Sequence, residues 1–82
     1  MKKDRNSIRK HLIDYLTNRL ELNEYELEDC KLHHFMDSLD IVEMVFEIER
    51  VYFVDLYDKW LEWEDRTLDE VIDCIYLSLN KN

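Results

Sequence analysis

The sequence predicts an all-α fold in which a single domain, residues 1–82, forms a bundle of three longer helices and one short helix. The chain contains no glycine and no proline, so it lacks the residues that tight hairpin turns need. Three segments carry apolar residues at intervals of three or four positions, which is the spacing of one helix face. A chain of 82 residues has room for one core only.

The first helix is expected from Ser7 to Leu20, where the apolar residues keep helical spacing. From Glu21 to Asp37 apolar residues are scattered among charges without a sustained period, which predicts a long structured loop. Loops of this length are uncommon inside compact domains and are usually functional. The residues expected to hold the loop in place are Leu27, Cys30, Leu32 and Phe35.

The second helix is expected from Asp37 to about Phe53, with Asp37 as its N-cap. One face is apolar, and the acidic residues Asp40, Glu43 and Glu47 lie roughly opposite. The apolar face consists of Ile41, Met44, Val45, Ile48 and Tyr52.

A short third helix is expected between Asp55 and Trp63, where two tryptophans and two leucines alternate with acidic residues. The last helix begins at Thr67-Leu-Asp-Glu70, a capping box in which the threonine and glutamate side chains each bond the backbone amide of the other. The apolar residues that continue this helix are Leu68, Val71, Ile72, Ile75 and Leu79.

Charge and apolar content limit the possible partners. The chain has 20 acidic residues against 11 Lys and Arg, a net charge of −9. This excess disfavours nucleic acid and favours proteins with basic surfaces. No apolar run approaches the ~20 residues that cross a bilayer, and the charged N-terminus has no apolar segment behind it. We therefore expect a cytoplasmic monomer that does not insert into membranes.

The sequence gives no sign of catalytic or metal chemistry of its own. It has no glycine-rich phosphate loop, and among its histidines and cysteines only Cys30 and His34 have the spacing of two ligands on one helix face. Cys30 and Cys74 are expected to be reduced thiols, because neither has a cysteine nearby in sequence. We expect no enzyme, no catalytic residue and no metal site.

The segment Asp37-Ser38-Leu39-Asp40, followed by Ile41-Val42-Glu43-Met44-Val45, resembles the phosphopantetheine attachment site of acyl carrier proteins. The resemblance covers most of the chain in order and spacing, with the serine near the middle. It implies that Ser38 carries a 4'-phosphopantetheine arm, moved from coenzyme A by a phosphopantetheinyl transferase that uses Mg²⁺. The arm would hold acyl intermediates as thioesters. It would deliver them to acyl-transfer, synthase or ligase enzymes of fatty acid or polyketide-like biosynthesis.

Elementary chemistry is consistent with a modified serine at this position. The first turn of a helix has free amides and the positive end of the dipole, which favour a phosphodiester. We expect no base beside Ser38, so a separate transferase must supply the chemistry. Two features depart from the family pattern. The loop before the serine has Phe35 where the family usually has glycine, and the short helix carries two tryptophans. These departures favour a specialised carrier.

Two groups of residues are assigned to this function. Negative charge and apolar contact for partner enzymes are expected from Asp37, Leu39, Asp40, Val42, Glu43, Phe46, Glu47 and Glu49. For the apolar members of this group, packing against the loop or the short helix is the alternative to docking. The resemblance also implies that an acyl chain can shelter between the second helix and the later ones, against Met44, Val45, Ile48, Tyr52, Leu61, Val71, Ile72 and Ile75.

Two other functions stay open. An aminoacyl or peptidyl carrier shares the attachment serine, although Met36-Asp37-Ser38 favours the acyl type. From a different class, the chain could be an unmodified acidic adaptor or inhibitor that binds a basic protein.

Overall fold

The computed structural model describes residues 4–28, 30–56 and 59–80. Within these ranges the protein is all-α, as predicted: its elements are helices, and the only β-type pairing is an isolated bridge between Lys31 and Thr67. The elements in chain order are α1 (Arg5–Leu20), α2 (Glu24–Leu27), the 3₁₀ helix η1 (Leu32–His34), α3 (Ser38–Tyr52), α4 (Trp60–Trp63) and α5 (Leu68–Leu79).

Each of the three long helices begins at a side chain that caps it. The Asp4 carboxylate accepts a hydrogen bond from the Ser7 amide at 2.7 Å, which is why α1 begins at Arg5, two residues before the predicted start. Asp37 caps α3 as predicted. Thr67 caps α5 within the predicted capping box.

The predicted loop is more ordered than its composition indicates, because it contains α2 and η1. Asn23 and Glu26 form a reciprocal capping box at the start of α2. The fully buried Leu27 then anchors this single turn to the core. Local capping chemistry therefore forms a fifth α-helix among the described residues, where the apolar periodicity predicted none.

The short helix is shorter than predicted. Residues 53–56 are not helical, residues 57–58 lie outside the described residues, and α4 is a single turn, Trp60–Trp63. Val54 and Leu56 supply apolar contacts to the core from extended chain. The apolar residues of this segment therefore pack without a continuous helix.

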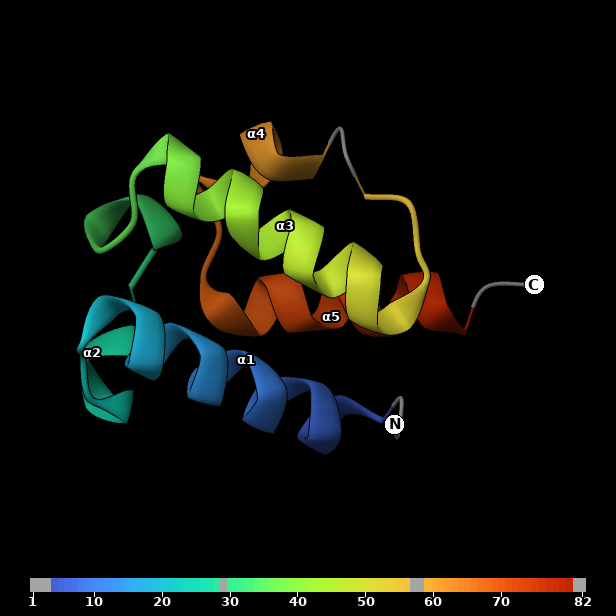
Figure 1. The fold of residues 1–82 in the computed structure, drawn as a ribbon, viewed down its shortest axis with the longest axis horizontal. Coiled ribbons are helices and arrows are strands. Elements are labelled where there is room, and N and C mark those ends of the chain that lie inside the picture. The colour runs from blue at the N-terminus through green and yellow to red at the C-terminus, as the bar shows by residue number, and fades with distance from the viewer. Residues whose placement is uncertain (1–3, 29, 57–58, 81–82) are drawn as a thin grey trace.

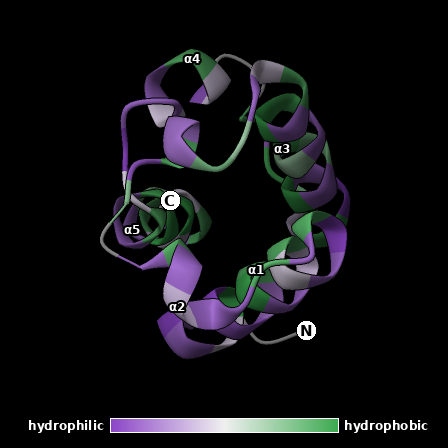
Figure 2. Cartoon of the chain, turned by 90° about the vertical axis from the view of Figure 1, so that its left-hand side faces the viewer, coloured by the Kyte–Doolittle hydropathy of each residue, from purple (hydrophilic) through white to green (hydrophobic). Residues whose placement is uncertain are grey.

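The helices surround one apolar interior (Figures 1 and 2). α1 runs antiparallel to α5 and packs against it, and α4 lies against α3 (Figure 1). α3 lies across the interior from α5 (Figure 2). The predicted core face of α3 is confirmed in full, since the buried residues of this helix are Ile41, Met44, Val45, Ile48 and Tyr52. In the part of the chain that the structure describes, every helix is too short or too polar to span a bilayer.

Candidate functional site around Ser38

Ser38 is the first residue of α3, and its position is set by a reciprocal pair of carboxylates. The Asp37 carboxylate accepts a hydrogen bond from the Asp40 amide at 2.8 Å, and Asp40 accepts one from the Asp37 amide at 3.4 Å. The helix start is therefore fixed by local chemistry, and the Ser38 side chain projects from it into solvent. Free amides and the positive end of the α3 dipole lie beside the hydroxyl.

The Ser38 hydroxyl has a carboxylate partner, which corrects the expectation that no base lies beside it. Its Oγ donates a hydrogen bond to Oε1 of Glu64 at 2.9 Å. Glu64 directly follows α4, 26 residues further along the chain. No sequence signal singles it out among 20 acidic residues, because only the packing of α4 against α3 brings it to the serine.

The acidic side of α3 is not a free charged surface. Arg19 of α1 pairs with Glu43 at 2.6 Å and with Asp40 at 3.4 Å. Glu49 accepts a hydrogen bond from the backbone amide of Leu56 at 2.7 Å. The prediction that Asp40, Glu43 and Glu47 lie on the free side of α3 holds only in part, because α1 covers this flank of the helix. Among the predicted acidic docking residues on or beside α3, Asp37 is exposed and the other four are half-buried.

The Glu47 carboxylate of α3 is largely enclosed, because its side chain is only 19% exposed. Its Oε1 accepts a hydrogen bond from Arg50 at 2.7 Å, and its Oε2 lies 3.0 Å from Nε2 of His11. The Arg50 hydrogen bond, opposed by partial burial and assisted by His11, holds the pKa of Glu47 below its ordinary value. On the other side of the imidazole, Nδ1 of His11 lies 2.9 Å from the hydroxyl of the buried Tyr52. Glu47 therefore ties α3 to α1.

Two of the three apolar residues predicted to contact partners are exposed at the surface. Leu39 is 65% exposed, Phe46 is 50% exposed, and Val42 between them is half-buried. Their spacing along the helix places them on one stripe that begins one residue after Ser38. Leu39 and Phe46 are therefore not packed inside the protein, and their role in docking stays a prediction. We call the three residues the apolar stripe.

Seven of the eight residues predicted to line an acyl cavity are buried core residues; they are Met44, Val45, Ile48, Tyr52, Val71, Ile72 and Ile75. Leu61 does not belong with them, because its side chain is 63% exposed. The single turn of α4 directs Trp63 rather than Leu61 into the core. The seven are packed in one cluster, as expected for an interior of native density.

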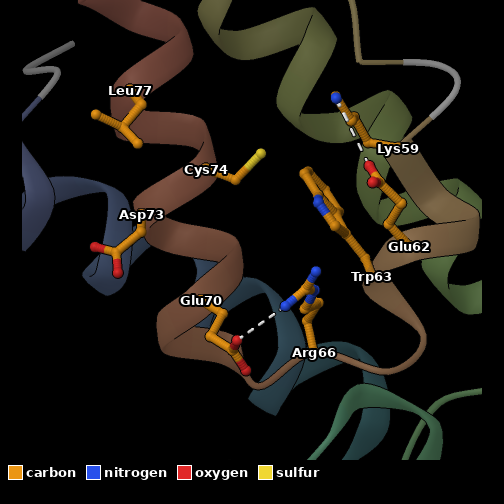
Figure 3. A pocket seen from close by; sticks show the side chains of 8 residues that line it. All are labelled: Lys59, Glu62, Trp63, Arg66, Glu70, Asp73, Cys74 and Leu77. Atoms are coloured by element: carbon orange, nitrogen blue, oxygen red, sulfur yellow. Dashed lines mark hydrogen bonds and ion pairs between the residues drawn. The ribbon is translucent and has the colours of Figure 1, made fainter.

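A hollow of about 420 Å³ opens elsewhere, between α4 and α5 (Figure 3). The Trp63 ring and the Cys74 thiol face each other across it, with Arg66 at one end and Lys59 at the other (Figure 3). Arg66 pairs with Glu70 at 3.3 Å, and Lys59 lies 3.6 Å from Glu62. The sequence gives no direct sign of this groove, although the two tryptophans of α4 indicate that this segment packs unusually.

The described residues include no group of three or more histidine, cysteine or acidic side chains placed to hold a metal ion. Cys30 and Cys74 are both free thiols and half-buried. His34 accepts a hydrogen bond from the Lys31 amide at 3.2 Å, so it has a local structural partner.

Comparison with protein-family models, with curated proteins and with solved structures finds no match for this chain.

Proposed function

We propose that the protein is an acyl carrier protein whose Ser38 receives a 4'-phosphopantetheine arm from coenzyme A. The observation that carries the proposal is the placement of Ser38, an exposed hydroxyl at the first position of a long capped helix beside an exposed apolar stripe. The all-α architecture is compatible with it, with α1, α3, α4 and α5 as the four helices of the carrier bundle.

The residues at Ser38 fit the arm. A phosphodiester on Oγ would lie beside the unpaired amides of the first turn of α3, where negative charge is favoured. The exposed side chain leaves room for a transferase to reach the hydroxyl. When bound, the arm supplies a terminal thiol that holds acyl groups as thioesters. Mg²⁺ belongs to the transferase in this proposal, not to the carrier.

Docking is assigned chiefly to the apolar stripe and to Asp37. Arg19 pairs with Asp40 and Glu43, and Arg50 pairs with Glu47, so the net attraction that these carboxylates offer to a basic enzyme surface is reduced. Exposed apolar side chains near the attachment site gain free energy when a partner buries them, although area alone does not set the affinity. The partners we propose are a phosphopantetheinyl transferase and acyl-transfer, synthase or ligase enzymes of fatty acid or polyketide-like biosynthesis.

The deciding experiment is intact-mass spectrometry after incubation with coenzyme A, Mg²⁺ and a broad-specificity phosphopantetheinyl transferase. We expect a gain of one arm per chain that persists under reducing conditions and is lost in Ser38→Ala. Ser78→Ala is the matched control and should retain the gain, as should Cys30→Ala and Cys74→Ala. If no transferase modifies the wild-type protein, the acyl carrier proposal fails and the acidic adaptor becomes the better hypothesis.

A second experiment tests docking on the apolar stripe. Phe46→Ala should raise the KM of the transferase for the carrier several-fold, whereas kcat should change little once the carrier is bound. Phe53→Ala is the matched control, because Phe53 is more exposed than Phe46 but lies just beyond the far end of α3 from Ser38. Equal effects of the two substitutions would refute docking on this stripe. Loading assays with acyl and aminoacyl groups would then separate the acyl carrier from the aminoacyl or peptidyl carrier.

A further inference from the structure

The hydrogen bond between Ser38 and Glu64 lies where three parts of the chain meet. The Glu64 side chain accepts from the Ser38 hydroxyl, and its backbone carbonyl accepts from the His33 amide at 3.1 Å. Two residues later, the Arg66 carbonyl accepts from the Leu32 amide at 2.8 Å. Residues 64–66, which we call the α4–α5 junction, are thus attached to η1 by backbone hydrogen bonds and to α3 through Ser38.

The same junction borders the groove between α4 and α5. Trp63, immediately before Glu64, forms one wall of the groove, and Arg66 closes one end of it (Figure 3). A displacement of Glu64 would therefore be transmitted to two groove residues that are close neighbours along the chain. The groove and Ser38 are linked through a segment only three residues long.

Modification of Ser38 removes the chemical basis of this hydrogen bond. In the transfer step, which rests on the proposed function, Ser38 Oγ attacks the phosphorus of coenzyme A that carries the pantetheine. An Oγ–P bond forms, the P–O bond to adenosine 3',5'-bisphosphate breaks with its electron pair, and the hydroxyl proton leaves to a base of the transferase. The ester oxygen has no hydrogen to donate, and the phosphodiester carries a negative charge beside the Glu64 carboxylate.

We propose that the Ser38–Glu64 hydrogen bond is a latch that holds the α4–α5 junction against α3 in the unmodified protein, and that modification of Ser38 opens it. Two effects act in the same direction: the donor is lost, and two negative charges are brought close together. The modified form then has a loosened junction and an altered groove wall at Trp63 and Arg66. Partner enzymes would meet a surface near the arm that differs from that of the unmodified carrier.

Hydrogen–deuterium exchange of the junction and α4 amides, measured before and after arm attachment, tests the latch. In the wild-type protein, modification should raise exchange in this segment by about threefold to tenfold, as the loss of one solvent-exposed side-chain hydrogen bond allows. In Glu64→Gln the rise should be much smaller, because the amide is uncharged and can donate to the phosphodiester. Glu62→Gln is the matched control, since Glu62 pairs with Lys59, and it should behave as the wild type does.

The Ser38–Glu64 latch can be tested independently of arm attachment. Ser38→Ala removes the donor alone, and Ser38→Asp removes the donor and adds a charge. Junction exchange should rise in the first and rise further in the second, whether or not a transferase modifies the protein. The absence of a mass gain would refute the proposed function only. Unchanged junction exchange in both serine variants, or equal responses of Glu64→Gln and Glu62→Gln to modification, would refute the latch.

Discussion

Replacing His11 with alanine should destabilise the fold well beyond the effect expected of a surface residue. The imidazole joins α1 to α3 through two contacts, one to the Tyr52 hydroxyl at 2.9 Å and one to the Glu47 carboxylate at 3.0 Å. Both ring nitrogens are satisfied when the Tyr52 hydroxyl donates to Nδ1 and Nε2–H donates to Glu47. Tyr52 is only 1% exposed, so its hydroxyl cannot exchange this partner freely for water.

The magnitude follows from what each substitution leaves behind. His11→Ala leaves a buried hydroxyl without its partner, which costs about 1 to 3 kcal/mol. Tyr52→Phe removes the hydroxyl but leaves His11 bonded to Glu47, and should cost about 0.5 to 1.5 kcal/mol. In the double variant no unpaired hydroxyl remains. The double variant should therefore lose less stability than the two single losses added together, and the difference should be about 0.5 to 3 kcal/mol.

Urea and thermal unfolding followed by circular dichroism would measure these values. For a chain of this size each kcal/mol lost corresponds to a fall in Tm of about 4 to 8 °C. Lys10→Ala, at the exposed neighbouring position, is the control and should change stability by no more than about 0.5 kcal/mol. Strict additivity of His11→Ala and Tyr52→Phe would refute the inference that one shared hydrogen bond links the two helices here.

Three further predictions concern pH, capping and backbone conformation. Hydrogen bonding from Arg50, opposed by partial burial and assisted by His11, lowers the pKa of Glu47. This carboxylate therefore stabilises the fold at pH values above 4.5, the ordinary pKa of a glutamate. That contribution should be lost as the pH falls from 4.5 through the lowered value, and an acid titration of Tm in the wild type and in Glu47→Gln should differ in this window. Thr67→Ala should lower stability by about 1 kcal/mol, because the hydroxyl accepts from the amide of the third residue of α5, and an unchanged urea midpoint would contradict this. Phe53→Gly should raise stability by up to about 1 kcal/mol, because Phe53 has a φ of 58° and is 91% exposed, so that no packing is lost; a lower Tm would show that the ring contributes.

Local interactions explain why so much of the fold could be predicted. The core face of α3 repeats every three or four residues, so its five buried members follow from the helical period alone. The caps at Asp37 and Thr67 depend on partners three residues away. The same kind of local chemistry builds α2, and it was missed because its capping residue is an asparagine in a segment without apolar periodicity.

The candidate site likewise has local features, which could be predicted, and contacts between helices, which could not. That Ser38 begins a capped helix, and that apolar residues follow it at helical spacing, could be predicted from the sequence because both properties belong to one segment. Which polar groups around the site are already paired could not be predicted, because their partners lie on other helices. His11 reaches Glu47 across 36 residues and Ser38 reaches Glu64 across 26. Such pairs depend on how α1 and α4 pack against α3, and the packing depends on shape and burial along whole helices rather than on any short motif.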